Sequence, residues 1–571
     1  MASPAASVQQ DDIDSTDPHL TDPTLLRDHS EFKSYTTSRF KYSGIRVFYR
    51  QHAKADQLPK KPAPLPLLVF LHGLGGSVAQ FHRLLSSLVD EAPCMAIDYP
   101  GCGRSEFSVT NWDAYTTDAL VELLETVIED YRDKDAGQRV VLIGHSMGTG
   151  LAAKLANTQL EHTTSLAELG GPNSASIIRF VGKDADEATR KLQYRFNRQS
   201  RTPVFRRMAN GALPLYHNGK PKGGLPTLEV WAGLNIPVFL IGAKGDTVVS
   251  PEEAEKIAKA LGPEKTLPES GSSEETHEAI ADASAPVSTS TRPQDHMPQA
   301  IEDLNDDDFT KAKSPVPPSS EEDSPNDPST PDETMTELPA QPNHPRKVVK
   351  TIMMPSPATH AVLYAPCSVR AVAGLISDFL ATHVTGRLSL AWQLQYLSRE
   401  GKWDVKNLNK WKSVNPVSEP IGPAGKPIFR ALKTLREVDD VHYQPVYDPR
   451  GLERAGIYYH KFPTVSKIPP EAREVEAFIK LVDDLRDQQP ARATAEDWTN
   501  PEQCVIGVHC HYGFNRTGYF IVCYLVERCD FGVQEAIDTF AKARPNGIRH
   551  SHFLDRLYVR YNVDTVSASQ S

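Results

Sequence analysis

Residues 139–157 read RVVLIGHSMGTGLAAKLAN, and this stretch decides the fold of the first half of the chain. The apolar run VVLI is typical of a strand buried on both faces, and the Ala-rich run at the end is typical of a helix. Between them lies GHSMG, whose two glycines permit a strained turn that lifts Ser146 above the sheet edge at the start of a helix. This arrangement predicts that Ser146 is a nucleophile; a serine in a plain turn is the alternative.

Apolar runs and helical patterns alternate on both sides of this turn. A helical spacing of apolar residues runs from Ala114 to Tyr131. Short buried strands separated by helices predict a mostly parallel sheet, and therefore an α/β fold. The strand-like runs are IRVFYR (45–50), PLLVFLHG (66–73), PCMAIDY (93–99), IPVFLIGAKGDTVVSP (236–251) and RKVVKTIMMPSPATH (346–360).

A serine nucleophile needs a base, and the base needs a carboxylate that orients it. Asp246 follows the strand-like run VFLIG, and His360 ends the loop after TIMM. The order Ser146, Asp246, His360 along the chain is that of a catalytic triad at successive strand ends. Asp98, in DYPGCGRS, is the rival acid, but its place after an early strand favours a structural role.

The tetrahedral intermediate of acyl transfer also needs two N–H donors. The loop HGLGG (72–76) offers the backbone N–H of Leu74, and Met147, directly after the predicted nucleophile, offers the second. We therefore expect Leu74 and Met147 to form an oxyanion hole. A glycine-rich turn that binds nothing is the alternative.

HGLGG, DYPGCGRS, GHSMG, GAKGD and ATH together resemble the α/β-hydrolase superfamily, in its esterase, lipase and peptidase-like branch. The resemblance implies an α/β-hydrolase fold over residues 31–263 and 347–385, with a helical cap at about 172–232. It also implies a small acyl substrate, such as an ester or a thioester, without indicating which one.

A second strand, loop and helix follow in QCVIGVHCHYGFNRTGYFIVCYLVERC (503–529). A loop of HCx5R spacing points backbone N–H groups inward, and the helix start adds positive potential, so both cradle a phosphate and lower the pKa of Cys510. The Cys510 thiolate would attack phosphorus, while Arg516 would hold two phosphate oxygens. A structural cysteine and a His-Cys-His metal cluster are the alternatives, although the cluster lacks a fourth ligand nearby.

The other residues of this loop are expected to surround the phosphate. Thr517 is placed to donate a hydrogen bond to the cysteine as it leaves, and His509 to fix the loop. The predicted phosphate-binding loop consists of His509, His511, Tyr512, Gly513, Phe514, Asn515 and Thr517.

GVHCHYGFNRTGY, AIDTFAKARPNGIRHSHFLDRLYVRY, GPAGKPIFRALKT and YDPRGLERAGIYY resemble the cysteine-dependent protein tyrosine phosphatase superfamily. The similarity is stronger to the dual-specificity branch, which contains the RNA 5′-triphosphatase domain of animal mRNA capping enzymes. The resemblance covers residues 402–565 and implies a second α/β domain of the protein tyrosine phosphatase type. It assigns Cys510 as the nucleophile that forms a cysteinyl-phosphate, and Arg516 as the phosphate clamp.

One departure from ordinary tyrosine phosphatases concerns the general acid. Those enzymes carry an aspartate in the loop after the strand that corresponds to AGIYYHKFP (455–463), yet TVSKIPP (464–470) contains none. A tyrosine phenolate needs protonation to leave, whereas a phosphate hardly does, so phosphoanhydrides fit better. Asp439 lies where capping-type enzymes carry an aspartate; Asp483 and Asp484 fall in an expected helix and are predicted to be solvated.

The negative charge of the chain is concentrated in one segment. The formal net charge is −11, and residues 264–346 alone hold 19 Asp and Glu against 5 Lys and Arg. This segment is rich in Pro and Ser and poor in aromatic residues, so it cannot bury enough apolar surface to offset the entropy of ordering. We therefore predict a disordered acidic insertion at 264–346 and a shorter disordered tail at 1–30.

The compartment is predicted from what the sequence lacks. No run approaches the roughly 18 apolar residues of a membrane span, and no secretory signal is visible, so we expect no membrane association and a cytoplasmic or nuclear location. The seven cysteines are scattered without CxxC spacing, which argues against a disulfide framework and a structural zinc site.

The sequence therefore predicts a bifunctional hydrolase with an acyl hydrolase site and a phosphatase site, neither of which needs a metal or an organic cofactor. The expected partner of the second site is a phosphorylated protein, a nucleotide or an RNA 5′ end. Residues 402–571 carry nearly balanced charge without a basic stripe, so RNA is not singled out. The alternative is a phosphatase whose first half only binds ligands or acts as a scaffold.

Overall fold

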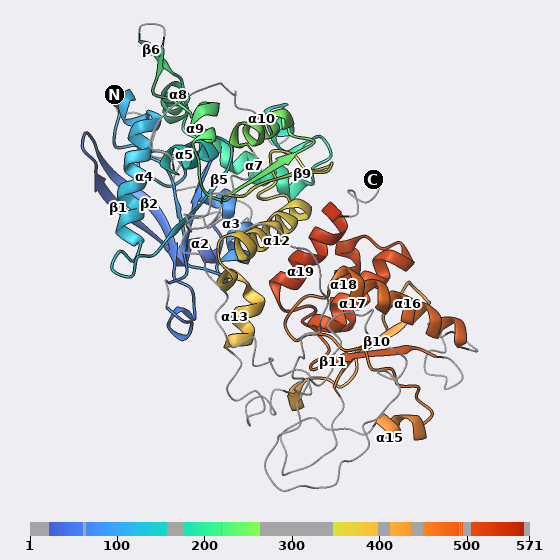
Figure 1. Ribbon diagram of the computed structural model, residues 1–571. Coiled ribbons are helices and arrows are strands. Elements are labelled where there is room, and N and C mark those ends of the chain that lie inside the picture. The colour runs from blue at the N-terminus through green and yellow to red at the C-terminus, as the bar shows by residue number, and fades with distance from the viewer. Residues whose placement is uncertain are drawn as a thin grey trace, which may run out of the picture.

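The computed structural model describes residues 22–60, 64–156, 175–217, 220–262, 347–397, 411–434, 449–489, 492, 494 and 504–564 (Figure 1). The predicted acidic insertion, most of the predicted N-terminal tail and Asp439 lie outside these ranges. Within them, the longest helices are too short or too polar to cross a bilayer.

The first half is built on a five-stranded sheet with the strand order β1-β2-β4-β3-β5. β3 pairs in parallel with β4 and β5, whereas β2 runs antiparallel to its neighbours β1 and β4. The predicted strand at 45–50 is therefore part of a longer strand, β2, which forms a hairpin with the edge strand β1. The strands are β1 (Ser30–Thr36), β2 (Lys41–Arg50), β3 (Leu67–Leu71), β4 (Cys94–Ile97) and β5 (Val140–Gly144).

Side chains of β3 alternate between two cores, one on each face of this sheet. Leu68 and Phe70 pack with helices α3 and α12, whereas Val69 and Leu71 pack with α4 and α5. Because both faces are covered, the whole strand is apolar and fully buried, as expected from the run LLVFL. The helices are α2 (Thr24–Asp28), α3 (His82–Leu88), α4 (Thr117–Tyr131), α5 (Met147–Ala156), α10 (Pro251–Leu261) and α12 (Pro366–His383).

Two further strands, β8 (Val238–Ala243) and β9 (Val349–Met354), form a separate parallel pair that corresponds to the predicted runs around Asp246 and before His360. A cavity of about 1490 Å³ is lined by residues of both β5 and β8. The cavity therefore includes the space between the two sheets. Its volume is larger than that of the space around the predicted catalytic residues alone.

The region predicted as a cap is mainly helical, as expected. Ile177, Val181 and Phe196 join the core on the α3 side of the sheet, whereas Val204 and Met208 join the core on the α4 side. These helices are therefore packed onto the fold through apolar contacts. The elements are α6 (Ala175–Val181), α7 (Glu187–Gln199), α8 (Thr202–Gly211), the hairpin β6 (Leu215–His217) and β7 (Lys220–Lys222), and α9 (Leu228–Ala232).

The second half has its own core around α17 and the parallel pair β10–β11. α17 starts directly after the predicted phosphate-binding loop and is buried along most of its length, which explains its apolar sequence. The elements are β10 (Phe429–Lys433), α15 (Pro449–Arg454), α16 (Ala472–Gln488), β11 (Ile506–Cys510), α17 (Asn515–Cys529), α18 (Val533–Ala543), α19 (Ser551–Val559) and the terminal turn η7 (Arg560–Asp564).

The expectation of a strand at 455–463 is wrong. The segment is irregular in the structure, and its apolar side chains do not cover a sheet: Ile457 is 54% exposed and Tyr458 is 91% exposed. The β-branched and aromatic residues of AGIYYHKFP form a strand only if one face finds a partner, and only Phe462 of this segment packs against the core of the second half.

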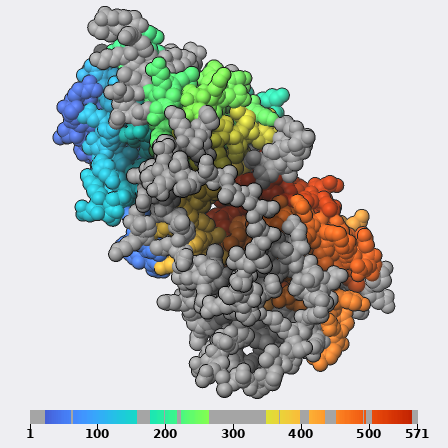
Figure 2. All heavy atoms as spheres, viewed as in Figure 1, coloured from blue at the N-terminus to red at the C-terminus, as the bar shows by residue number. Residues whose placement is uncertain are grey.

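The two halves meet where α12 lies along α19 (Figure 1), and in Figure 2 the yellow segment that contains α12 borders the red segment that contains α19. A Cβ at Gly374 of α12 would lie 2.9 Å from a methyl group of Val559, so a glycine permits this close helix contact. Arg370 of α12 pairs with Asp555 of α19 at 2.8 Å. α13 (Leu390–Tyr396) follows and packs on the first half through Trp392.

A buried carboxyl group, Glu91, lies beside this junction. It receives hydrogen bonds from the Ser377 hydroxyl of α12 at 2.7 and 2.9 Å. Burial, together with the nearby carboxylates of Asp555, Asp378 and Asp90, raises the pKa of Glu91 to about 8, although the hydrogen bond from Ser377 acts in the opposite direction. The folded chain therefore holds a proton that the unfolded chain releases at lower pH, so this group contributes stability at low pH that is lost as the pH rises toward 8.

We predict that Glu91→Gln flattens this pH dependence, because the amide cannot ionise. Between pH 5 and 8 the midpoint of thermal unfolding of the wild type should fall by roughly 5–10 °C more than that of the variant. Calorimetry at several pH values measures the difference, with Glu229→Gln at an exposed position of α9 as the control. Parallel pH curves for wild type and Glu91→Gln would contradict the assignment.

Candidate functional sites

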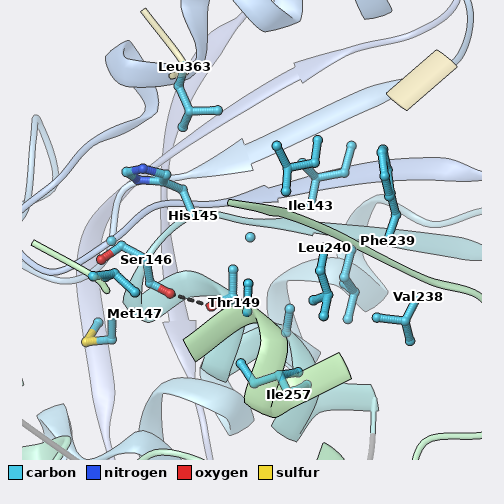
Figure 3. A pocket seen from close by; sticks show the side chains of 18 of the residues that line it. Ile143, His145, Ser146, Met147, Thr149, Val238, Phe239, Leu240, Ile257 and Leu363 are labelled. Atoms are coloured by element: carbon cyan, nitrogen blue, oxygen red, sulfur yellow. Dashed lines mark hydrogen bonds between the residues drawn. The ribbon is translucent and has the colours of Figure 1, made fainter. Parts of the chain in front are cut away.

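The turn at Ser146 has the strained geometry that its sequence predicts. Ser146 has a φ of +53°, a left-handed conformation that non-glycine residues rarely adopt. A Cβ at Gly148 would lie 2.0 Å from the Leu71 carbonyl oxygen, and a Cβ at Gly144 would lie 2.5 Å from the Gly148 carbonyl oxygen. Both glycines are therefore required by crowding. The Thr149 hydroxyl donates to the Ser146 carbonyl oxygen at 2.6 Å (Figure 3).

Asp246 and His360 form the pair that the chain order predicts. His360 Nδ1 lies 2.8 Å from Asp246 Oδ2, and Asp246 Oδ1 accepts the backbone N–H groups of Val248 and Val249 at 2.8 and 2.9 Å. Burial opposes ionisation of Asp246, but the hydrogen bond and charge of His360 and these N–H groups outweigh it and lower its pKa. The ionised carboxylate holds the proton on Nδ1, which leaves Nε2 of His360 free to accept one.

His145, inside GHSMG, supports His360 in a way that the sequence does not reveal. The two rings lie 4.7 Å apart, and His145 Nε2 lies 3.1 Å from the His360 carbonyl oxygen. Burial, together with the charge of His360, lowers the pKa of His145 to about 3. The neutral ring must therefore carry its proton on Nε2 to donate to that carbonyl. The ring of Phe180 packs edge-on against His360 at 5.4 Å.

Ser146, Asp246 and His360 line the same cavity as Leu74 and Met147, the predicted oxyanion donors. A Cβ at Gly73 would lie 3.4 Å from Ser146 Oγ, so the loop before Leu74 passes directly over the serine. Among the described residues, however, no hydrogen bond joins the Ser146 hydroxyl to the His360 ring. A longer approach is common before substrate binds.

Asp98 has the structural role expected for the rival acid. It is fully buried and accepts the backbone N–H groups of Val78 at 2.6 Å and Arg104 at 2.9 Å. Its third partner is the guanidinium of Arg46, at 3.5 Å. These contacts hold two loops against the sheet, and none of them involves His360.

Cys510 ends β11, and the predicted phosphate-binding loop turns from it into α17. Burial alone would raise the pKa of the Cys510 thiol, but the charge of Arg516 and hydrogen bonds from the backbone N–H groups of Thr517 and Gly513 lower it. The buried Thr517 hydroxyl, which meets no nitrogen or oxygen acceptor in the described part of the chain, adds to this lowering. The thiolate is therefore favoured, and the same N–H groups suit phosphate oxygens.

The shape of this loop is fixed by a residue that sequence reasoning missed. The buried guanidinium of Arg544 donates to the carbonyl oxygens of Tyr512 at 2.8 Å, Gly513 at 3.3 Å and Asn415 at 2.7 Å. With these carbonyl groups bound from outside, the loop N–H groups face inward. The only signal in the sequence is the first arginine of ARPNGIRH, which gives no hint of its partners.

The remaining predicted loop residues also lie around Cys510. Asn515 Oδ1 accepts the backbone N–H groups of Arg549 at 2.7 Å and His550 at 3.2 Å, which ties the start of α17 to the segment before α19. His511 and Tyr512 pack edge-on at 4.2 Å. His509 Nδ1 lies 3.4 Å from the Cys510 carbonyl oxygen, and Arg544 and Arg549 lie over the Phe514 ring.

Arg516, the predicted phosphate clamp, rests on the loop that follows the irregular segment. Its guanidinium donates to the Thr464 carbonyl oxygen at 2.8 Å and to the Thr464 hydroxyl at 3.2 Å. Thr464 begins TVSKIPP, the stretch in which tyrosine phosphatases carry their general acid. The loop therefore positions the clamp.

The carboxylates considered as general acids of the phosphatase site are engaged in other contacts. Asp483 pairs with Arg528 at 2.8 Å and Asp484 with Lys480 at 2.6 Å, both on or against α16. Glu474 is the carboxylate whose pKa responds to Arg516, but burial raises its pKa and its Oε2 accepts the Glu471 N–H at 2.7 Å. Glu474 thus acts as a cap of α16. Within the described ranges, no group of three or more His, Cys, Asp or Glu side chains is arranged to hold a metal ion.

Comparisons with known proteins assign a class to each half. Residues 68–283 match the family described as "Alpha/beta hydrolase family", and residues 486–563 match "Dual specificity phosphatase, catalytic domain". The chain therefore contains an α/β-hydrolase domain followed by a dual-specificity phosphatase domain of the protein tyrosine phosphatase superfamily.

Named relatives resemble only parts of this chain. It is 37% identical over 125 residues to a protein named "mRNA-capping enzyme" from Mus musculus, which covers 22% of this chain and 19% of that protein. It is 30% identical over 122 residues to a "Tyrosine-protein phosphatase" of Autographa californica nuclear polyhedrosis virus, which covers 21% of this chain and 66% of that protein. It is 27% identical over 195 residues to "Abhydrolase domain-containing protein C57A10.08c" of Schizosaccharomyces pombe, which covers 27% of this chain and 53% of that protein. The chain thus spans about a fifth of the capping enzyme that it matches.

Proposed function

We propose that this chain is a bifunctional hydrolase, with a cysteine-dependent phosphatase site in its second half and a serine acyl hydrolase site in its first. The observation that carries the proposal is the Cys510 thiol, whose pKa is lowered despite burial because the Arg516 charge and inward N–H groups surround it. Such a thiolate is the chemical requirement for nucleophilic attack on phosphorus.

In the phosphatase reaction, the Cys510 thiolate forms the bond to phosphorus as the bond to the leaving group breaks. Arg516 and the loop N–H groups hold the equatorial oxygens, where negative charge is concentrated. Water then releases the phosphate and the sulfur leaves as a thiolate again, assisted by the Thr517 hydroxyl. Because TVSKIPP supplies no aspartate, a leaving group that departs without protonation is favoured.

We propose a phosphoanhydride as the substrate class, and an RNA 5′-triphosphate or a nucleotide polyphosphate as its representative. The similarity to proteins named mRNA-capping enzyme supports this choice. The second candidate is a phosphorylated protein, supported by the similarity to a viral protein named tyrosine-protein phosphatase.

We predict that Cys510→Ser abolishes phosphate release, because a serine hydroxyl in this loop stays protonated. The assay follows inorganic phosphate from 5′-triphosphate RNA, from a phosphotyrosine peptide and from p-nitrophenyl phosphate. Cys529→Ser, at the far end of α17, is the matched control and should retain wild-type rates. Phosphate release that survives Cys510→Ser would rule out the assignment, and a preference for the peptide would select the second candidate.

In the first half, His360 would take the proton of the Ser146 hydroxyl as the serine attacks an acyl carbon, and return it to the leaving group. Asp246 fixes the required tautomer through its 2.8 Å contact. The N–H groups of Leu74 and Met147 would receive the oxyanion. The substrate we propose is a small ester or thioester. Ligand binding without turnover is the alternative, and a Ser146–His360 hydrogen bond that stays absent when substrate binds would select it.

We predict that a fluorophosphonate probe labels the wild-type chain and that Ser146→Ala abolishes the labelling, because the probe reports only an activated serine. Ser86→Ala, at an exposed position of α3, is the matched control and should label normally. Labelling is measured by in-gel fluorescence. A wild type that stays unlabelled would favour the non-catalytic first half.

The described cysteines are free thiols, and the buried ones lie in both halves. We propose that the chain works in a reducing compartment, the cytoplasm or the nucleus.

A further inference from the structure

The loop that holds Arg516 is attached to the first half of the chain. Gln395 of α13 donates from Nε2 to the Ser466 carbonyl oxygen at 3.0 Å. In the other direction, the Lys467 ammonium donates to the Leu394 carbonyl oxygen at 2.7 Å. Leu394 lies in the last turn of α13, so Lys467 caps this helix end and meets its negative dipole.

α13 is itself anchored on the hydrolase domain. Gln393 is buried and donates from Nε2 to the Glu91 carbonyl oxygen at 2.7 Å and to the Arg387 carbonyl oxygen at 2.8 Å. Trp392 packs into the core on the α3 side of the five-stranded sheet. Since α13 is held on the first half in this way, its contacts with the phosphatase loop join that loop to the first half.

The same loop is fixed to the phosphatase domain on both sides of Thr464. Before it, the Phe462 ring packs edge-on against Phe478 at 6.0 Å and Phe520 at 5.5 Å. After it, His552 of α19 contacts the Lys467 carbonyl oxygen through Nε2 at 2.9 Å. Burial lowers the pKa of His552 to about 4, so the ring is neutral at physiological pH and donates from Nε2.

Lys467 has a φ of +68°, which costs energy for a residue with a side chain. This conformation directs the lysine toward α13 while its carbonyl group faces His552. Glycine would adopt this backbone geometry without strain, but it would lose the ammonium that reaches Leu394. The position therefore combines backbone strain with a contact that only a long cationic side chain supplies.

We propose that α13 of the hydrolase half clamps the phosphatase loop at 464–467, so that Gln395 and Lys467 act as positioning residues for Arg516. The inference rests on the proposed phosphatase function and deepens it. The chain of contacts runs from α13 through Ser466 and Lys467 to Thr464, and from Thr464 to the Arg516 guanidinium. The phosphatase site therefore depends on an element outside its own domain.

The test uses full-length Lys467→Met and Gln395→Leu, singly and together. If Arg516 loses its support, kcat/KM for p-nitrophenyl phosphate should fall by about 10- to 100-fold in the double variant, mainly through kcat, because small displacements of a clamp weaken transition-state contacts. Lys467→Arg keeps a cation that reaches the α13 carbonyl and should retain most of the activity. Lys480→Met, at an exposed position of α16, is the matched control.

A second readout separates positioning from simple loss of fold. The pH dependence of iodoacetamide alkylation at Cys510, followed by mass spectrometry, should shift to higher pH in the double variant, since a displaced Arg516 stabilises the thiolate less. Fluorophosphonate labelling and thermal unfolding of the same samples report whether both domains remain folded.

The outcomes are distinguishable. A wild type without Cys510-dependent phosphatase activity contradicts the proposed function, and the alkylation profile still tests the clamp. An active wild type whose double variant stays within about twofold of its kcat/KM, with an unchanged alkylation profile, overturns the clamp and leaves the function in place.

Discussion

Both proposed nucleophiles depend on the same constraint, which is the absence of a Cβ where a sharp turn meets the end of a neighbouring parallel strand. A Cβ at Gly148 would lie 2.0 Å from the carbonyl oxygen of Leu71 on β3, and a Cβ at Gly513 would lie 2.2 Å from the carbonyl oxygen of Leu432 on β10. Only glycine permits this packing. In each half it brings a side chain, Ser146 or Cys510, to the junction between a strand end and a helix start.

The two sites share this backbone geometry but differ in their electrostatics. In the first site the ionised Asp246 holds Nδ1 of His360 and so fixes the tautomer in which Nε2 can accept a proton. The second site accumulates positive potential around Cys510 from Arg516 and backbone N–H groups, and Arg544 keeps those groups aimed inward. The first arrangement suits a nucleophile that is activated during the reaction, whereas the second suits one that is already ionised.

The sequence predicts the features that are encoded locally. GHSMG and HCx5R each specify their turn through glycines and neighbours within ten residues, and so the turns that hold Ser146 and Cys510 could be predicted without a structure. Asp246 and His360 could be placed because their strands precede them directly. The strand expected around Tyr458 does not form, because a run of β-branched and aromatic residues reads the same whether or not a strand finds a partner.

Contacts between distant segments could not be predicted. The partners of Arg544, the support of His360 by His145, and the attachment of Lys467 to Leu394 join residues whose sequence separation gives no pattern. Each depends on how helices cross in space, and a single arginine, histidine or lysine in a sequence is most often solvated. The attachment of the phosphatase loop to α13 belongs to this group, and it makes the two halves one functional unit.

The most direct test of the account is the ultraviolet titration of the Cys510 thiolate, taken as the difference between the wild type and Cys510→Ser, and repeated in Gly513→Ala. The account predicts that the wild-type thiolate forms below the ordinary cysteine pKa of about 8.5, and that Gly513→Ala moves the titration to higher pH because the N–H groups no longer converge. A wild-type titration at or above the ordinary value would contradict it.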